Sequence, residues 1–474
     1  MLGQPCQRVF CIVPPTGRYI REDRCQTPIE KMKTIALRPP IDLMYAAGSF
    51  EAAGAEVRLT DYPGEQWGWD RLEQDLREFQ PDAILLSITT PSLDQDMEAA
   101  VLAKRVDPKI VTMAKGAHFN TRDVQTLEQY AALDVVFRGE YEQTCAELAR
   151  GAAPASILGI TWRDTDGAVQ RNGDRPFTDD LDAIPFPARH LTHNELYIRP
   201  DTMEVQTTII TNRGCPFHCI YCLANQVSGT KNRYRSVENV VAEIRQCVER
   251  HGIRNFLFRS DLFTQNKKWV IELCQSIIEA GLDIQWASNS RVDTVNPEVL
   301  GWMRKAGCWI IALGVESGDQ ETLDRIQKKA TVAQAFQAVR WIREAGIKSS
   351  VYLLMGLPWD TPETIERQMA FARELDPDIL EIFYPYPFPG TALYDLCVKQ
   401  GLIREGEIPR DAYSDPATGG LYMSVDDFKR LRKQAIRDFY LRPSKIIRTL
   451  RGAPTLGEKI NYIKAGVREL FSHA

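Results

Sequence analysis

Three cysteines lie within eight residues of one another, in the run Gly-Cys-Pro-Phe-His-Cys-Ile-Tyr-Cys. Cys215, Cys219 and Cys222 have the spacing C-x3-C-x2-C, and three thiolates on one short loop can hold an iron–sulfur cluster. Clusters that only carry electrons take four Cys ligands. Three ligands leave one iron with an open coordination position, as in a catalytic zinc site. The motif therefore predicts a [4Fe–4S] cluster that takes part in chemistry.

Two other interpretations of the loop are a zinc knuckle and three unpaired thiols. His218 would be a poor fourth zinc ligand because it shares the short loop, and no C-x2-C or H-x3-H partner follows. The remaining eight cysteines are scattered along the chain. Cys247, Cys274 and Cys308 fall in apolar patterns, so we expect them to be buried fillers, whereas Cys25 lies in a polar run and has no assigned role.

Composition narrows the class of protein. The chain has 474 residues, enough for two or three domains. It is 44% hydrophobic and 26% charged, as soluble globular proteins are, and a net charge of −5 gives no global case for nucleic-acid binding. The sequence shows neither a long apolar run nor signal-peptide features, and the scattered cysteines suit a reducing compartment. We therefore expect a cytoplasmic protein.

The first third of the chain alternates apolar runs with helical patterns. Such alternation predicts a parallel sheet with helices on both faces, which binds ligands at the carboxyl ends of its strands. No G-x-G-x-x-G follows the first strand, which argues against a dinucleotide. We expect strands at 9–13, 57–61, 83–89, 109–114 and 135–138, and helices at 41–53, 69–79, 93–105 and 140–150.

Small, polar or turn-forming residues follow these strands. A Ser/Thr run at a strand end is, taken alone, more often a turn or a helix cap than a binding wall. The candidate wall residues are Pro14 and Thr16 after the first strand, Ser87, Thr89, Thr90 and Ser92 at the third, Gly116 and His118 at the fourth, and Gly139 and Glu140 at the fifth.

The centre of the chain contains six further β-α repeats. Their spacing leaves room for one helical crossover each, which predicts a parallel barrel with its reactive groups at the carboxyl ends of the strands. The strands are expected at 206–211, 255–259, 284–289, 309–315, 349–355 and 379–384. Polar residues stand at several of these ends: Asp261, Asn289, Arg291, Glu316 and Ser317.

The cysteine spacing, the preceding strand and Tyr221 before the last cysteine resemble the signature of radical S-adenosylmethionine (SAM) enzymes. The resemblance implies a six-stranded partial TIM barrel in which Cys215, Cys219 and Cys222 hold the cluster and Tyr221 packs against the SAM adenine. It also implies that Asp261 lies near the SAM amino group and that Asn289, Arg291, Glu316 and Ser317 bind the rest of SAM. A zwitterionic ligand needs such a mixture of a cation and acceptors.

The first third is similar to the cobalamin-binding domain that precedes the barrel in one large subgroup. The resemblance rests on Pro-Pro after the first strand, Ser-Ile-Thr-Thr-Pro-Ser after the third and Gly-Glu-Tyr-Glu after the fifth. It implies that the candidate wall residues face cobalamin. The only His in the domain, His118, lacks the D-x-H-x-x-G context of a cobalt ligand, so we expect it to be a wall residue. The lower cobalt face is then left to water or an apolar side chain.

This resemblance implies an α/β chain of four parts, with boundaries at 1–150 (cobalamin-binding), 151–200 (linker), 201–400 (barrel) and 401–474 (helical and basic). It implies an enzyme that makes a 5′-deoxyadenosyl radical from SAM and transfers a methyl group from methylcobalamin to an unactivated carbon. A flavodoxin or ferredoxin would supply electrons. Oxidative cyclisation or ring rearrangement with the same cofactors remains an alternative, as does a non-catalytic cobalamin sensor or electron carrier.

The end of the chain is basic and amphipathic. Residues 426–440 fit an amphipathic helix, and residues 441–474 carry seven Lys and Arg against two Glu, interspersed with aliphatic residues. Such a segment either lies on the inner, anionic face of a membrane or packs on the barrel with solvated charges. A membrane location would favour a lipid-like substrate over another small molecule.

Overall fold

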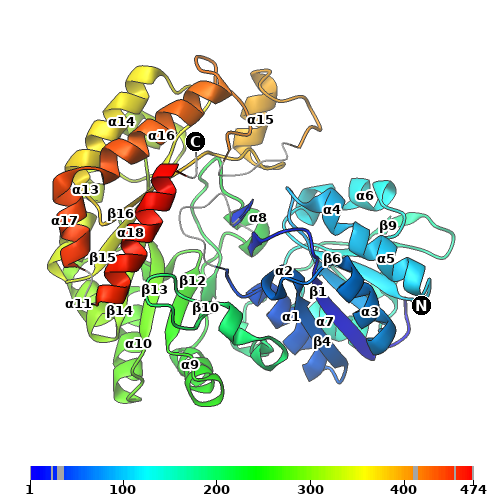
Figure 1. Ribbon diagram of the computed structural model, residues 1–474. Coiled ribbons are helices and arrows are strands. Elements are labelled where there is room, and N and C mark those ends of the chain that lie inside the picture. Colours follow the sequence, from blue (N-terminus) through cyan, green and yellow to red (C-terminus); the bar gives the residue numbers. More distant parts are fainter. Residues whose placement is uncertain (1, 23–24, 29–36, 409–414, 453–454, 472–474) are drawn as a thin grey trace. The chain divides into compact units, whose positions relative to one another are not determined.

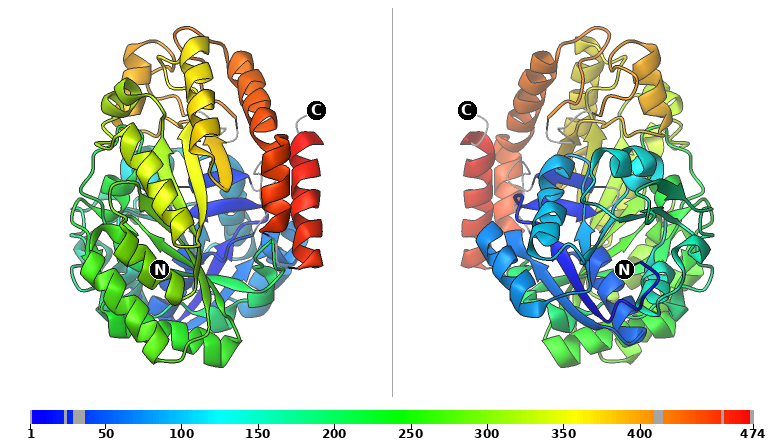
Figure 2. Two further views of the ribbon diagram at one scale, coloured as in Figure 1. Left: turned by 90° about the vertical axis from the view of Figure 1, so that its left-hand side faces the viewer. Right: turned by 90° about the vertical axis from the view of Figure 1, so that its right-hand side faces the viewer.

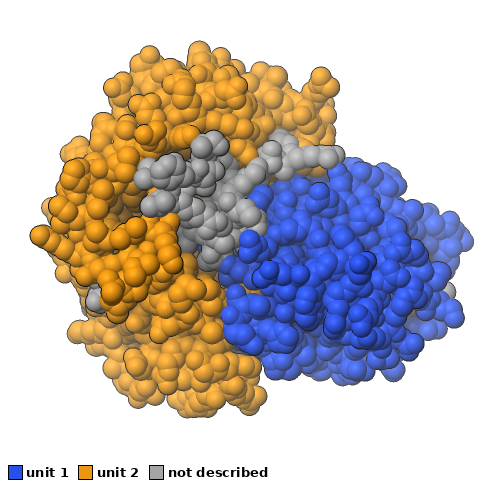
Figure 3. All heavy atoms as spheres, in the orientation of Figure 1, with its two compact units in different colours: residues 1–28, 37–196, 223–233 blue, residues 29–36, 197–222, 234–474 orange. Residues whose placement is uncertain are grey.

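The computed structural model describes the chain except residues 1, 23–24, 29–36, 409–414, 453–454 and 472–474. The chain forms two compact units (Figure 3). The first comprises residues 1–28, 37–196 and 223–233, and the second comprises residues 29–36, 197–222 and 234–474. The connector up to residue 196 therefore groups with the first unit, as does the segment that follows the three cysteines.

The first unit is built on a seven-stranded sheet of order β4-β1-β5-β6-β7-β8-β9. The first five strands are parallel, and β8 and β9 add an antiparallel hairpin at one edge. The strands are β1 (Arg8–Val13), β4 (Glu56–Asp61), β5 (Ala83–Ser87), β6 (Val111–Lys115), β7 (Val135–Phe137), β8 (Ile160–Arg163) and β9 (Val169–Arg171). The predicted α/β alternation is confirmed.

The helices of this unit are α1 (Ile41–Ala52), α2 (Tyr62–Glu65), α3 (Trp69–Phe79), α4 (Leu93–Asp96), α5 (Glu98–Val106), α6 (Phe119–Gln129), α7 (Glu142–Ala149) and α8 (Ala224–Ser228). The single helix expected at 93–105 is two helices. Sequence analysis also missed α6 and the hairpin of β2 (Tyr19–Glu22) with β3 (Cys25–Pro28). The helix α6 is polar along much of its length and the hairpin strands are short, so neither carries a clear apolar period.

Strand order identifies the ligand-binding edge of this sheet. The strand β1 lies between β4 and β5. The next parallel strand, β4, is added on one side of β1, and all later strands, from β5 on, are added on its other side. Open parallel sheets bind ligands at the carboxyl ends of the strands where the order reverses. Here that point lies between the ends of β1 and β5, where Thr16 and the Ser/Thr run follow.

The second unit contains a sheet of order β11-β10-β12-β13-β14-β15-β16, in which β10 and β12 to β16 are parallel. The strands are β10 (Gln206–Arg213), β11 (Arg233–Tyr234), β12 (Asn255–Ser260), β13 (Gln285–Arg291), β14 (Cys308–Glu316), β15 (Lys348–Leu354) and β16 (Ile379–Phe383). Figure 1 shows helices along the outer side of this sheet. The six predicted barrel strands are confirmed.

The helices that follow the barrel strands begin with a side-chain cap. In each case a Ser, Thr, Asn or Asp side chain accepts a hydrogen bond from a backbone N–H of the first turn, which satisfies a donor that the helix itself leaves unpaired. The helices are α9 (Val237–His251), α10 (Lys267–Glu279), α11 (Pro297–Lys305), α12 (Gln320–Arg325), α13 (Val332–Glu344) and α14 (Pro362–Leu375), capped by Ser236, Asn266, Asn296, Asp319, Thr331 and Thr361.

Alternate residues of the barrel strands face two environments. Phe258 and Trp286 belong to the hydrophobic core that includes residues of the outer helices, and their rings stack with centroids 4.6 Å apart. Arg259, one residue after Phe258, and Asn289, three residues after Trp286, are less buried. Successive side chains of a strand point to opposite faces. The polar residues therefore share the inner face.

The chain ends in α15 (Ala392–Lys399), α16 (Val425–Tyr440), α17 (Pro443–Arg451) and α18 (Leu456–Phe471). The Tyr440 hydroxyl of α16 accepts from the Leu380 N–H (2.8 Å) and donates to the Leu380 carbonyl (2.9 Å) on β16. Lys445 of α17 is buried and donates to the Asp378 carbonyl (2.7 Å). These helices pack on the barrel unit. Within the described part of the chain, no helix is both long and apolar enough to cross a membrane.

Candidate functional site

The three-cysteine loop follows β10 and exposes its thiols more than the other cysteines. Cys215, Cys219 and Cys222 are half-buried, whereas the seven other cysteines whose side chains are described are buried. Burial raises the pKa of the Cys274 thiol to about 12, so it stays protonated. Cys247, Cys274 and Cys308 are buried as predicted, and the side chain of Cys25 lies outside the described residues.

Hydrophobic packing and backbone bonds seat this loop. Ile220 belongs to a cluster with residues of α12, α15 and the loop after β15, including Ile326, Leu357 and Leu393. The Ile220 N–H donates to the Ile326 carbonyl (3.2 Å), and its carbonyl accepts from the Leu393 N–H (2.9 Å). Gly214, with φ of 97°, donates its N–H to an Asp261 carboxylate oxygen at 2.5 Å. The loop is therefore held just before its first cysteine, at Gly214, and between its second and third, at Ile220.

The donors fit an iron–sulfur cluster better than a single metal ion. Among the described residues, no group of three or more His, Cys, Asp or Glu side chains could hold one metal ion, and His218 is exposed. In a four-iron cluster each thiolate binds a different iron, so the three sulfurs need not converge on one point.

Arg291 at the end of β13 is the cation beside this loop. Its guanidinium lies 3.7 Å from the centre of the Phe217 ring, bonds the Asp293 carboxylate (2.9 Å) and donates to the Lys328 carbonyl (2.6 Å). Burial lowers the pKa of Arg291, but Asp293 and the Cys219 and Cys215 thiolates outweigh it and hold the pKa above its usual value. A fixed positive charge of this kind favours thiolates.

Glu316 links the loop to the end of β14. It is buried, adopts a φ of 69°, and accepts a hydrogen bond from the Lys328 ammonium at 2.7 Å. Burial and the Glu316 carboxylate, to which Tyr221 is hydrogen-bonded, raise the pKa of the Tyr221 hydroxyl well above its ordinary value. The structure thus brings Tyr221 and Glu316 together. Sequence analysis missed Lys328, although a Lys-Lys pair between two helical patterns is visible in the sequence.

The remaining predicted barrel residues are held by their own unit. Asn289 donates to the Ser260 carbonyl (2.9 Å), which ties β13 to β12. Ser317 is only 2% exposed, donates to the Gln368 amide oxygen (3.1 Å) and accepts from the Asp319 N–H (3.1 Å). Asp261 and Asn289 are therefore rim residues that also brace the loop and sheet, whereas the Ser317 hydroxyl bonds both α14, through Gln368, and its own turn, through Asp319.

In the first unit, a buried carboxylate organises the predicted Ser/Thr residues. Asp96, at the end of α4, is fully buried and accepts hydrogen bonds from Thr16 Oγ1 (2.5 Å), Ser92 Oγ (2.5 Å) and the Arg21 guanidinium (2.8 Å). Thr89 Oγ1 lies 2.5 Å from Ser92 Oγ. Three of the predicted hydroxyls thus form one network around a residue that sequence analysis missed. The one-turn spacing from Ser92 to Asp96 was the available signal.

The β2–β3 hairpin contacts the same strand ends. Arg21 donates to the Ser87 carbonyl (2.7 Å), and the Gln26 side-chain oxygen accepts from the Thr90 N–H (2.7 Å). Pro14 is buried at the end of β1. The hairpin therefore fixes the backbone after β5, and Arg21 also donates to the Thr16 hydroxyl beyond the end of β1 (2.8 Å).

The other predicted wall residues have distinct surroundings. Gly116 has a φ of 153°, and a Cβ there would lie 2.4 Å from the Ile88 carbonyl oxygen, so only Gly allows this approach. His118 is buried, and burial with help from Arg122 lowers its pKa to about 4. It is therefore neutral at neutral pH, as a wall residue would be.

Glu140 is occupied by an ion pair. Its two oxygens accept from the Arg233 guanidinium at 2.8 and 3.0 Å, and one also accepts from the Thr178 N–H (2.7 Å). The adjacent Gly139 donates its N–H to the Asn120 side chain (2.9 Å). Glu140 thus holds the segment that follows the cysteines in the chain.

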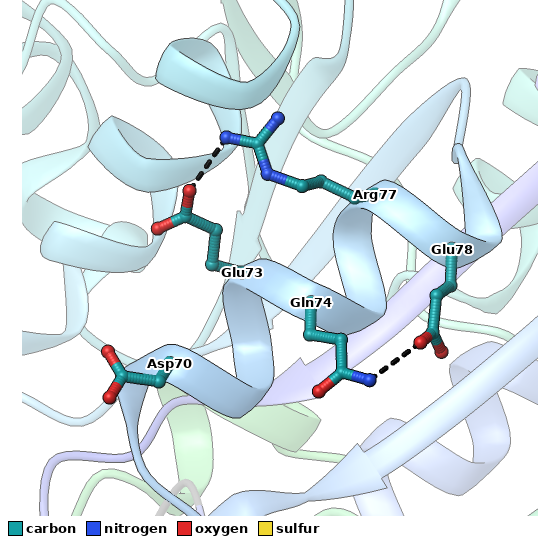
Figure 4. Close-up of a pocket in the computed structure, with 5 residues that line it drawn as sticks. All are labelled: Asp70, Glu73, Gln74, Arg77 and Glu78. Atoms are coloured by element: carbon teal, nitrogen blue, oxygen red, sulfur yellow. Dashed lines mark hydrogen bonds and ion pairs between the residues drawn. The ribbon is translucent and has the colours of Figure 1, made fainter.

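A hollow on α3 is not a candidate site. It is lined by Asp70, Glu73, Gln74, Arg77 and Glu78, all from one helix (Figure 4). Arg77 pairs with Glu73 (2.7 Å) and Gln74 with Glu78 (2.7 Å), one turn apart. These contacts are ordinary pairs on a solvated helix surface.

Comparison with known families agrees with the geometry. The radical SAM superfamily matches residues 209–372, and the B12 binding domain matches residues 37–149. An uncharacterized methyltransferase of Pyrococcus horikoshii is 29% identical over 94% of both chains. An anaerobic magnesium-protoporphyrin IX monomethyl ester cyclase of Cereibacter sphaeroides is 31% identical over 75% of this chain and 60% of its own. A hopanoid C-3 methylase of Methylococcus capsulatus is 28% identical over 81% and 71%.

Solved structures share the fold. The cobalamin-dependent SAM radical enzyme OxsB, with aqua-cobalamin and SAM bound, aligns with all of this chain and 72% of its own at a TM-score of 0.75 and 16% identity. The methyltransferase TsrM of Kitasatospora setae, with cobalamin and a [4Fe–4S] cluster bound, aligns with 83% of this chain and 78% of its own at a TM-score of 0.68 and 18% identity. The predicted family and fold class are confirmed: the chain contains a radical SAM domain at residues 209–372, preceded by a B12-binding domain at residues 37–149.

Proposed function

We propose that this enzyme transfers a methyl group to an unactivated carbon, using a [4Fe–4S] cluster, SAM and cobalamin. The observation that carries the proposal is the three-cysteine loop, whose half-buried thiols lie beside the Arg291 guanidinium in a barrel unit that shares its chain with a B12-binding unit. When bound, these cofactors would supply a radical that removes a hydrogen atom and a methyl group that replaces it.

The barrel residues would bind and orient SAM. Cys215, Cys219 and Cys222 would hold the cluster. Arg291 supplies positive charge beside them, and Glu316 supplies a buried acceptor that is hydrogen-bonded to the Lys328 ammonium at 2.7 Å. We assign Tyr221 to the adenine, and Asp261, Asn289, Arg291, Glu316 and Ser317 to the rest of SAM.

The first unit would bind cobalamin at the ends of β1 and β5. Its proposed contacts are Pro14, Thr16, Ser87, Thr89, Thr90, Ser92, Gly116, His118, Gly139 and Glu140. Small hydroxylated side chains can approach a bulky ring and still bond its amides. Because Thr16 and Ser92 donate hydrogen bonds to Asp96, their oxygens can meet cobalamin only as acceptors. We propose that the cobalamin-binding part ends at residue 150, the linker at residue 200 and the barrel at residue 400.

The proposed substrate class rests on a relative, and the proposed partner rests on the need to reduce the cluster. We propose a small or lipid-like substrate, because a hopanoid methylase is among the relatives, and a flavodoxin- or ferredoxin-type reductant for the cluster. Eleven cysteines scattered through a long chain suit the reducing cytoplasm, where we place the enzyme. We also propose peripheral contact at the inner membrane face through the basic C-terminal region.

The test uses the anaerobically reconstituted, reduced enzyme. SAM cleavage to 5′-deoxyadenosine is expected, and it should be lost with the cluster in Cys219→Ala but kept in the matched control Cys247→Ala, whose thiol is buried elsewhere. A non-catalytic sensor would show no cleavage. Methyl-labelled SAM, incubated with cell extract and cobalamin, should place label in a product.

Cyclisation is the second candidate, and the 31% identity to a cyclase favours it specifically. It predicts 5′-deoxyadenosine and a product with altered mass but without methyl label. That outcome would overturn the methylation proposal and keep the radical SAM assignment.

A further inference from the structure

One face of the C-terminal helix α18 is aliphatic and exposed. Leu456 is 74%, Ile460 42% and Ile463 52% exposed. Their spacing of four and three residues places them on one side of a helix. A stripe of this kind is distinct from scattered surface aliphatics because its members are neighbours along the helix axis.

The other side of α18 holds the helix to its unit. Asn461 donates its side-chain amide to the Asp201 carbonyl (2.9 Å). Tyr462 accepts from the Lys348 ammonium (3.2 Å), which also lies over its ring at 5.3 Å. The helix is therefore already docked through one face, and the aliphatic stripe is not the surface by which it packs on the barrel.

The neighbouring helix α17 repeats the pattern. Ile446 is 43% and Ile447 49% exposed, whereas Lys445 is buried and Arg448 bonds the Asp376 carboxylate. The two helices lie side by side in both views of Figure 2. Aliphatic side chains thus face outward on both helices while basic side chains of α17 secure it from within.

Positive charge accompanies the exposed aliphatics. Arg451 at the end of α17 and Lys464 on α18 are exposed, and Lys459 lies next to Ile460. Over α17 and α18 the sequence carries six Lys and Arg against two Glu. Apolar side chains flanked by cations are the composition that anionic lipid surfaces attract, since the aliphatics enter the acyl boundary and the cations meet the headgroups.

We propose that this surface, formed by Ile446, Ile447, Leu456, Ile460 and Ile463 with Arg451, Lys459 and Lys464, binds the anionic face of a membrane. This proposal extends the membrane contact named in the proposed function, because it states which residues make the contact and which lipid charge they bind. The contact does not depend on which reaction the enzyme catalyses. A peripheral enzyme docked in this way meets lipid-like substrates at the bilayer surface. The proposed ligand of this surface is anionic lipid. The rival explanation is that the surface binds a second copy of the chain.

The test is flotation of the reconstituted full chain with vesicles of phosphatidylcholine alone or mixed with phosphatidylglycerol. Binding is expected to the mixed vesicles and to weaken with salt. The stripe variant Leu456→Ser/Ile460→Ser/Ile463→Ser should bind more than about tenfold more weakly. Its control is Ile278→Ser on α10, which removes an aliphatic side chain of similar exposure, 43%.

Charge is tested separately. Arg451→Ala/Lys464→Ala should lower affinity for the mixed vesicles about 25-fold, since each basic residue near an anionic surface contributes about fivefold. Its control is Lys267→Ala/Lys268→Ala, which removes two exposed lysines of α10.

Absence of binding to mixed vesicles, or equal binding by stripe variant and wild type, would overturn the proposal. Light scattering that shows a dimer converted to monomer by the stripe variant, without vesicle binding, would assign the surface to self-association. Cleavage of SAM is measured in the same variants and should be unchanged, so failure of membrane binding and failure of the proposed chemistry are distinguishable.

Discussion

Replacement of Asp96 by Asn tests whether this buried carboxylate positions the proposed cobalamin wall. Asp96 is fully buried, and its oxygens accept from Thr16 and Ser92 at 2.5 Å and from two Arg21 nitrogens at 2.8 and 2.9 Å. Asn preserves the side-chain volume but removes the charge and turns one acceptor into a donor. At least one of the groups that donate to Asp96 then faces the Asn amide donor. The Arg21 guanidinium also loses its counter-ion, and the Arg21 side chain is only 4% exposed.

The expected magnitude has two parts. Breaking a buried ion pair by removing one partner costs about 3–5 kcal/mol of unfolding free energy, because it leaves an uncompensated charge. Cobalamin binding should suffer further, since Thr16, Thr89 and Ser92 lose fixed orientations that they must regain on binding. At about 0.5–1.5 kcal/mol for each immobilised side chain, three side chains give about 1.5–4.5 kcal/mol, or a tenfold to thousandfold loss of affinity.

A matched control separates positioning from stability. Asp75 on α3 is also fully buried and also pairs with a hydroxyl and arginines: Tyr62 (2.7 Å), Arg58 (2.7 Å) and Arg71 (3.0 Å). Asp75→Asn should lower stability similarly and leave cobalamin affinity within about twofold of wild type, the scatter of distant independent sites. Denaturant unfolding of the cofactor-free chain measures stability, and an absorption titration with hydroxocobalamin measures affinity. Equal affinity losses in both variants, or none in Asp96→Asn, would refute the reasoning.

Three further predictions concern single residues. Because the pKa of His118 is lowered to about 4, its contribution to stability is present above pH 6.5 and lost as the pH falls toward 4. We expect the free energy of unfolding to fall by about 2 kcal/mol between pH 6.5 and pH 5, and His118→Gln should abolish this loss. Denaturant unfolding that shows the same dependence of stability on pH in both proteins would contradict the prediction. Gly116→Ala should destabilise by about 2–4 kcal/mol because its Cβ would lie 2.4 Å from a carbonyl oxygen. Gly139→Ala should destabilise by only about 1–2 kcal/mol, because its Cβ would meet no atom of the described residues within 4 Å. Thermal unfolding of both variants measures this difference, and equal losses would contradict it. Lys328→Met should leave Glu316 without its cation and weaken SAM binding in calorimetry by about tenfold or more, with recovery in Lys328→Arg; unchanged binding in the Met variant would remove Lys328 from the site.

The sequence predicted the strands and helices whose apolar pattern is visible within the segment itself. Strong alternation of apolar strands with capped helices gave the barrel strands to within a few residues, and the helix at Trp69–Phe79 was predicted with its observed bounds. It did not predict α6, whose sequence is mostly polar; its apolar residues Phe119 and Leu127 are buried in the core of the first unit, while Val124 is half-buried. Tertiary burial decides such segments, and a single sequence does not encode which neighbours will cover them.

The same division separates the site residues that were predicted from those that were missed. Residue type and position at a strand end select side chains such as Thr16 and Glu316. Their orientation depends on Asp96 and Lys328, which come from other segments and bond them at 2.5 and 2.7 Å. A buried charge must be paired, so Asp96 is required once Arg21 is buried, and Lys328 once Glu316 is buried. Each unit therefore holds polar residues of its candidate site through one buried ion pair, Arg21 with Asp96 in the first and Lys328 with Glu316 in the second. Substitutions of Asp96 or Lys328 should perturb binding, although neither residue is a proposed cofactor contact.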